Sequence, residues 1–108
     1  MALRSLSSLT TEALTILGTA IRAARLQRGW SINDLAERVG VSHVTILKAE
    51  RGDPGVAIGT VFESANLVGV PLFDADPQER LRYGAQKRAE LALLPSRART
   101  TRPVDDDF

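Results

Sequence analysis

Cysteine is absent from this chain of 108 residues, and histidine occurs once, at His43. Without cysteine the chain can form no disulfide, zinc finger or iron–sulfur site, and it offers no thiol nucleophile. One histidine cannot build a metal site, and the sequence has no nucleophile–base pair, carboxylate pocket or phosphate loop. We therefore expect no metal, no cofactor and no catalytic activity.

Long apolar runs are absent too. No stretch approaches the roughly 20 residues that a membrane-spanning helix needs. The first ten residues contain no continuous apolar core followed by small residues for cleavage, so we expect no export signal. The expected location is the cytoplasm.

Neither sign of charge dominates, because 14 Lys and Arg face 13 Asp and Glu, for a net charge of +1. This balance argues weakly against a nucleic-acid partner, since proteins that bind nucleic acids are commonly basic on one face. Apolar residues make up 44% of the chain, enough for one compact domain with appendages. A chain of this length is too short for two independent cores.

Apolar residues at helical spacing predict helices joined by short turns. The first helix is predicted over residues 14 to 28 and ends at Gly29. The second begins at Ile32 after a Ser31 cap and ends at Gly40, and the third runs from a Ser42 cap to about residue 51.

The second half of the chain continues this pattern. A fourth helix is predicted to begin between residues 57 and 60, to bury Ile58 and to stop at Gly69. A short helical turn is predicted over residues 71 to 74. A last helix is predicted from the Asp76 cap and Pro77 to residue 94, followed by an extended or disordered tail.

Residues 32 to 51 have the features of two helices joined by a tight turn. Ala36 is small enough for a close crossing of two helices, Gly40 supplies the turn, and Ser42 caps the next helix. A glycine between two amphipathic helices would by itself indicate only an αα-hairpin. The order and spacing of these residues together predict a helix-turn-helix.

With these residues the chain resembles the Cro/CI-type helix-turn-helix repressors over roughly residues 15 to 73. The residues that carry the resemblance are Ile21, Arg22, Arg25, Gly29, Ser31, Leu35, Ala36, Gly40, Val41, Ser42, Ile46, Glu50, Gly52, Ala65, Gly69 and Val70. The resemblance implies an all-α fold: a five-helix lambda-repressor-like DNA-binding domain with an additional C-terminal helix and an extended tail. The expected parts are an N-terminal extension (1–12), the domain (13–74), a helix (75–94) and a flexible tail (95–108).

The resemblance also implies that the outward face of the third helix reads bases in the major groove of DNA. The residues on that face are His43, Val44, Thr45 and Lys48. Lys48 can donate to guanine, Thr45 can bond to a base or phosphate, and Val44 can contact a thymine methyl. For His43 the alternative is an exposed residue with no special task.

The resemblance also implies that several other residues contact phosphate groups of the DNA. Ser42 is expected to cap the helix and meet a phosphate. The family usually has glutamine at the position of Ile32, so that contact is lost here or made by Asn33. Further candidates, with solvated side chains as the alternative, are Arg22, Arg28 and Arg51. By resemblance, Arg25 and Glu50 form a mostly buried structural ion pair between the first and third helices.

A nearly neutral domain should bind DNA weakly as a monomer. We therefore expect a homodimer that reads two half-sites of double-stranded operator DNA about one helical turn apart. The expected dimer surface consists of the segment Leu72-Phe73 and of apolar residues on the last helix, namely Leu81, Ala85, Leu91 and Leu94. The alternative is that these leucines complete the core of the monomer.

The segment from Gly52 to Phe73 and the tail resemble HipB-type antitoxins. That family consists of small repressors that bind a HipA-like kinase toxin and repress the operon that encodes both. The tail ends in Asp105, Asp106, Asp107 and Phe108, which we expect to be a recognition peptide for the toxin; the alternative is a solvated acidic tail. The alternative functions are a Cro/CI-type repressor unrelated to a toxin and a toxin-binding inhibitor with weak DNA binding.

Overall fold

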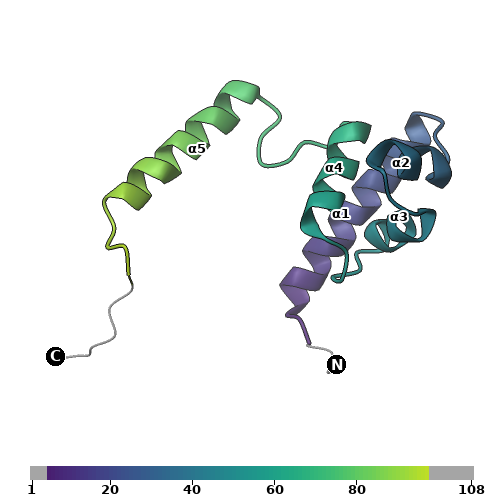
Figure 1. The fold of residues 1–108 in the computed structure, drawn as a ribbon, viewed down its shortest axis with the longest axis horizontal. Helices are drawn as coiled ribbons and strands as arrows, with labels where there is room; N and C mark the ends of the chain where they lie inside the picture. The colour runs from purple at the N-terminus through teal and green to yellow at the C-terminus, as the bar shows by residue number, and fades with distance from the viewer. Residues whose placement is uncertain (1–4, 98–108) are drawn as a thin grey trace. The chain divides into compact units, whose positions relative to one another are not determined.

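The computed structural model describes residues 5–97, which form five α-helices and no strand (Figure 1). The helices are α1 (Ser8–Gln27), α2 (Ile32–Val39), α3 (His43–Glu50), α4 (Ile58–Val68) and α5 (Pro77–Ala92). The all-helical class expected from the sequence is confirmed. The chain divides into two compact units, residues 1–72 with α1 to α4 and residues 73–108 with α5.

The first unit has one hydrophobic core, built where α1 to α4 meet. The buried core residues are Ile21, Leu35, Ala36, Ile46, Ala49, Val61, Ala65 and Val68. Ile21, Leu35 and Ile46 are fully shielded from solvent, and they come from α1, α2 and α3 respectively. The core therefore fixes the positions of these three helices relative to one another.

α1 and α4 pack together, and Figure 1 shows them running in the same direction. Before α4, Gly52 has φ +79°, and a Cβ on it would lie 2.9 Å from the backbone of Leu14 and Thr15. After α1, Arg28 donates from Nε to the carbonyl oxygen of Val68 at a distance of 3.0 Å. The loop before α4 thus lies against the first half of α1, and the two helices end together.

Two predictions about the first unit are wrong. α1 begins at Ser8 rather than Leu14, because Ser7 caps it by accepting a hydrogen bond from the backbone N–H of Thr10. Ile58 is 69% exposed rather than buried. It is the first residue of α4, and the buried face of that helix consists of Val61, Ser64, Ala65 and Val68.

In the second unit, α5 begins as predicted. The Asp76 side chain accepts from the backbone N–H of Gln78, and Pro77 occupies the first turn. The helix ends at Ala92 rather than residue 94, and none of its residues is buried. Leu81, Leu91 and Leu94 are 72%, 68% and 62% exposed.

The predicted helical turn over residues 71 to 74 is wrong, since this segment is a bend without helix. Phe73 has φ +67°, a left-handed conformation that costs a residue with a Cβ roughly 1–2 kcal/mol and ends any right-handed helix. The Phe73 ring lies beside the Tyr83 ring of α5, with centroids 6.1 Å apart. Across residues 5–97, no helix has the length and apolar character to cross a membrane.

Candidate nucleic-acid interface

α2 starts at a reciprocal pair of hydrogen bonds. Ser31 Oγ accepts from the backbone N–H of Asp34 at 3.0 Å, and Asp34 Oδ2 accepts from the backbone N–H of Ser31 at 2.8 Å. These bonds satisfy two of the donors that a helix start leaves open, and the bond from the Ser31 backbone holds the pKa of Asp34 below its usual value. The Ser31 cap predicted from the sequence is confirmed.

The turn between α2 and α3 depends on Gly40. Its φ is +87°, the left-handed conformation predicted for it. The N–H groups of Gly40 and Val41 both donate to the carbonyl oxygen of Ala36, at 2.8 and 3.0 Å. Ser42 then caps α3, because its Oγ accepts from the N–H of Thr45. Hydrogen bonds among residues 31–42 and the first turn of α3 therefore set the local geometry of the helix-turn-helix.

A buried ion pair holds the far end of α3. Arg25 of α1 donates from Nε to Glu50 Oε2 at 2.7 Å and from Nη2 to Oε1 at 3.0 Å. The hydrogen bond to the Glu50 carboxylate raises the pKa of Arg25, so the arginine stays charged although it is buried. The pair implied by the family resemblance is therefore present.

Gly18 allows α1 and α3 to approach closely. It is buried, and a Cβ on it would lie 2.5 Å from the carbonyl oxygen of Glu50 and 2.6 Å from that of Ala49. No side chain fits at that distance, so α3 lies directly against the backbone of α1. Together with the ion pair, this contact fixes the end of α3.

The outer side of α3 is open to solvent. Ile46 and Ala49 face the core, whereas His43 and Lys48 are exposed and Val44 is 46% exposed. The Thr45 hydroxyl lies 3.0 Å from Ser42 Oγ, so the two hydroxyls form a hydrogen-bonded pair at the start of the helix. The predicted base-reading residues are thus accessible on a helix that is fixed on its inner side.

The structure brings the predicted site residues together in three groups. Asn33 and His43 line one open cavity of about 360 Å³, which also contains Asp34 and Glu37. The two carboxylates make this edge of the surface unfavourable for phosphate. Asn33 is the neutral amide side chain beside these two carboxylates.

Thr45 and Lys48 form the second group, at a groove of about 260 Å³ that continues into the loop before α4. The opposite wall is made by Asp53, Gly55, Val56, Ala57 and Thr60. Asp53 Oδ1 accepts from the N–H of Gly55 at 2.7 Å, which shapes this loop. Thr60 lines this groove although it was not among the predicted site residues. The residue at the cap position of α4 is Ala57, which has no side chain that can hydrogen-bond to the helix start.

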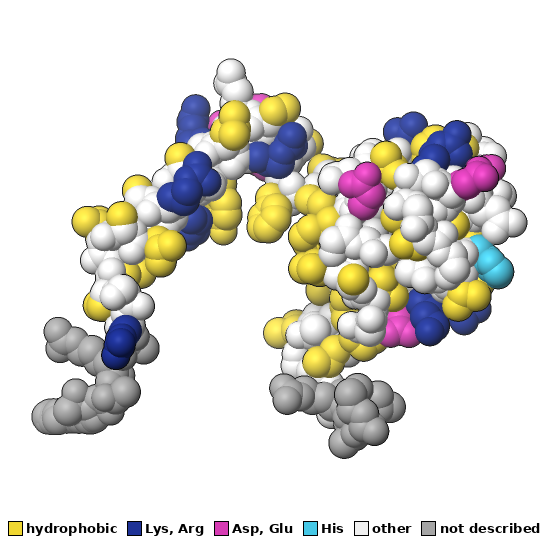
Figure 2. Space-filling model, in the orientation of Figure 1, with side chains coloured by type: hydrophobic (Ala, Val, Ile, Leu, Met, Phe, Trp, Pro, Cys, Tyr) yellow, Lys and Arg dark blue, Asp and Glu magenta, His cyan; other side chains and the backbone are white. Residues whose placement is uncertain are grey.

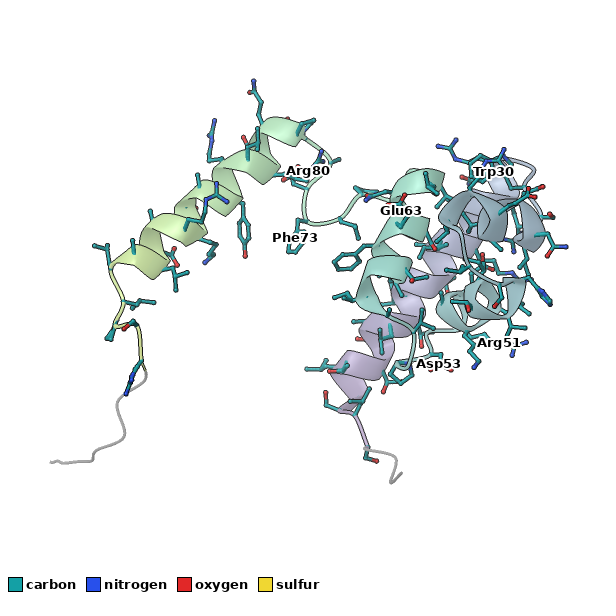
Figure 3. The ribbon with its side chains drawn as sticks, in the orientation of Figure 1. Trp30, Arg51, Asp53, Glu63, Phe73 and Arg80 are labelled. Atoms are coloured by element: carbon teal, nitrogen blue, oxygen red, sulfur yellow. The ribbon has the colours of Figure 1, made fainter. Side chains whose placement is uncertain are left out.

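Arg22 and Arg51 form the third group. They line an open cavity of about 190 Å³, together with the ion pair of Arg25 and Glu50. Both are exposed, and Figure 3 shows Arg51 at the end of α3, next to Asp53. In Figure 2, basic side chains gather below the histidine on this side of the unit. Both guanidinium groups thus lie at one open cavity next to the buried ion pair.

Arg28 has a different place from the other candidate arginines. Its Nε bonds to the carbonyl oxygen of Val68, and its guanidinium carbon lies 5.3 Å from the centre of the Trp30 ring. On the same ring, the guanidinium of Arg38 lies at 4.1 Å. Arg28 therefore links the ends of α1 and α4. The tail residues Asp105, Asp106, Asp107 and Phe108 lie outside the described residues.

Comparisons with known proteins agree with this geometry. The Helix-turn-helix family model matches residues 21–74, half of the chain. The HTH-type transcriptional regulator SutR of Escherichia coli is 36% identical over 64 residues, which cover 57% of this chain and 36% of that protein. An uncharacterised HTH-type transcriptional regulator of Mycobacterium tuberculosis is 40% identical over 77 residues, 71% of this chain and 29% of that protein.

The chain thus spans about a third of the length of these curated relatives. No solved structure gave a significant match. The matched residues include α2, the Gly40 turn, α3 and α4. The chain belongs to the Helix-turn-helix family.

Proposed function

We propose that this chain is a sequence-specific DNA-binding transcriptional regulator that acts as a repressor, binds operator DNA as a homodimer and reads bases with α3. The observation that carries the proposal is the fixed presentation of α3. Its inner side is buried and its last residue is bound by Arg25, while Val44 and Lys48 are exposed. The relatives that are named transcriptional regulators support the same function.

Each group of residues has a part in this proposal. Lys48, Thr45 and Val44 contact base edges, and His43 and Asn33 lie at one margin of the contact. Arg22, Arg51 and the Ser42 hydroxyl bind phosphates and set the register of the protein on the duplex. Arg28 adds a phosphate contact only if its remaining N–H groups reach the duplex, because its Nε is already bonded to Val68.

Salt dependence of operator binding tests the proposal. The operator is first selected from random duplexes, and its affinity is then measured over a series of salt concentrations. Two phosphate-binding cations in each of two protomers, namely Arg22 and Arg51, predict a slope of log K against log salt of about −3.6. Arg51→Gln should reduce the slope by about 2, whereas Arg38→Gln, whose guanidinium lies on Trp30, should leave it unchanged. Equal affinity for selected and random duplexes would contradict the proposal.

We further propose that the same protein acts as the antitoxin of a HipA-like kinase toxin. This role is supported by the resemblance of residues 52–73 to HipB-type antitoxins and by the aspartates at 105–107, whose negative charge suits a basic surface on a partner. The main alternatives are a repressor without a toxin and an inhibitor that binds DNA weakly.

A kinase-like gene adjacent to this one would supply the partner for a binding assay. Removal of residues 105–108 should weaken binding to that kinase and leave operator affinity nearly unchanged. If kinase binding is unchanged by the truncation, the tail has no part in it. If the full chain does not bind the kinase at all, the antitoxin role is wrong and the repressor proposal still stands on its own assay.

A further inference from the structure

α1 carries an apolar stripe that the first unit leaves open to solvent. Leu9 is 76% exposed and Ile16 is 61% exposed, although both are large apolar residues. Ala13, Ala20 and Ala23 complete the stripe. Successive steps of four and three residues from 9 to 23 place all five on one side of the helix.

α4 extends this apolar surface. Ile58, which is 69% exposed, and the half-buried Phe62 are one turn apart on it. α1 and α4 pack together in the same direction, and Figure 2 shows hydrophobic side chains gathered over α4 and the start of α1. We call Leu9, Ala13, Ile16, Ala20, Ala23, Ile58 and Phe62 the α1–α4 face. A connected apolar surface of this kind marks an interaction site.

The border of the α1–α4 face is acidic. Glu12 is the single charged residue between positions 8 and 20, and Glu63 is the single one between positions 57 and 70. Within residues 5–97, neither carboxylate takes part in a salt bridge. The face therefore favours a partner that is apolar in the middle and basic at its edges.

α5 has this chemistry. Its 16 residues contain four basic and two acidic side chains, and none is buried. One side of the helix is formed by Leu81, Gly84, Ala85, Arg88, Leu91 and Ala92. Arg88 lies in the middle of this side and makes no salt bridge in the described part of the chain. A lone helix of this length with an internal glycine is only marginally stable in water, so α5 needs a partner surface.

We infer that α5 of one copy packs on the α1–α4 face of a second copy, and that the contact is repeated by two-fold symmetry. Leu81 and Leu91 meet the exposed apolar residues, and Arg88 meets Glu12 or Glu63 of the partner subunit. The stripe on α1 is roughly 21 Å long and that on α5 roughly 16 Å, so the second fits within the first. The inference rests on the proposed homodimer and assigns its interface.

Crosslinking between differently tagged copies tests this contact, and the lack of native cysteine makes the assay clean. One copy carries Ile16→Cys, and the other carries Leu81→Cys or Leu91→Cys. A short bis-maleimide should join the two different chains. Crosslinks only between two Leu81→Cys or two Leu91→Cys chains, crosslinks only within a single chain that carries both cysteines, or no crosslink at all would each overturn the inference.

A pair of charge insertions on α1 gives an independent measurement. Ile16→Glu should weaken dimerisation at least about tenfold in sedimentation equilibrium, because it buries a charge in an apolar contact. Leu26→Glu is the matched control: Leu26 is 56% exposed on the same helix but lies off the stripe, so the dimer should persist. Circular dichroism verifies that both variants fold. Equal effects of the two variants would overturn the inference.

Two results separate this inference from the proposed function. If the interchain crosslink forms but no duplex is bound specifically, the interface stands and the DNA-binding proposal fails. If the selected operator is bound specifically but the crosslink is absent, the interface is wrong and the proposed function stands.

Discussion

Arg25 and Glu50 join α1 to the last residue of α3 by two parallel hydrogen bonds, 2.7 and 3.0 Å long, with both side chains at most 5% exposed. A third bond, from Arg25 Nη1 to the carbonyl oxygen of Trp30 at 2.8 Å, reaches the loop before α2. Arg25 of α1 thus bonds both to the end of α3 and to the loop before α2.

Glu50→Ala should destabilise the fold by about 3–5 kcal/mol, because it leaves the Arg25 charge buried without a partner. Urea unfolding followed by circular dichroism measures this loss. Glu37→Ala, which removes an exposed carboxylate from α2, should change the free energy of unfolding by no more than about 0.5 kcal/mol. A loss below about 1 kcal/mol for Glu50→Ala would show that the pair behaves like an exposed ion pair.

Gly18→Ala should destabilise the first unit by about 1–3 kcal/mol, since the added Cβ would lie 2.5 Å from the carbonyl oxygen of Glu50 and force α3 away from α1. The matched substitution is Gly59→Ala. No atom lies within 4 Å of a Cβ at that position of α4, so alanine should stabilise the helix by about 0.5–1 kcal/mol. Thermal unfolding of both variants measures the difference. Effects of the same sign would contradict the close crossing at Gly18.

Lys48→Ala tests the reading of bases by α3. If Lys48 donates to a base edge, the variant should lose roughly 1–3 kcal/mol of discrimination at one position in each half-site and should still fold. Binding to a set of operators with single base changes gives this value directly. Lys87→Ala, on α5, should leave the preference unchanged. An equal loss of affinity for operator and random DNA would assign Lys48 to phosphate instead.

The local features of the helix-turn-helix could be predicted from the sequence because they depend on near neighbours. Ser31, Ser42 and Asp76 cap their helices through bonds to residues two or three positions away. Gly40 takes the left-handed conformation that its place between two amphipathic stretches indicates. The same reasoning failed at the start of α1, where the cap at Ser7 precedes the apolar pattern.

Features that depend on distant parts of the chain could not be predicted in this way. The spacing of apolar residues predicted that Ile58 is buried, yet the packing of α4 leaves it exposed. Arg28 looked like any other basic residue near the motif, but its bond to Val68 spans 40 residues. Phe73 takes a positive φ that no pattern in the sequence indicates. These outcomes are decided by tertiary contacts, which periodicity does not encode.

The cap of α2 makes the stability of the first unit sensitive to acid. Hydrogen bonds from Ser31 hold the pKa of Asp34 below 3.8, its usual value. A carboxylate with a lowered pKa in the folded state contributes stability above its unfolded pKa, and this contribution is lost as the pH falls through the folded pKa. Asp34→Ala should therefore be less stable than the original chain at neutral pH, and the difference should shrink well below pH 3.8.

Thermal unfolding at the two pH values measures this difference, with Glu37→Ala as the control. Glu37 is an exposed carboxylate on the same helix, and its side chain accepts no hydrogen bond within the described part of the chain. Its removal should thus have nearly the same small effect at both pH values. A stability difference for Asp34→Ala that persists in acid would mean that the protonated side chain caps α2 as well as the carboxylate does, and the charge of Asp34 would then have no part in the cap.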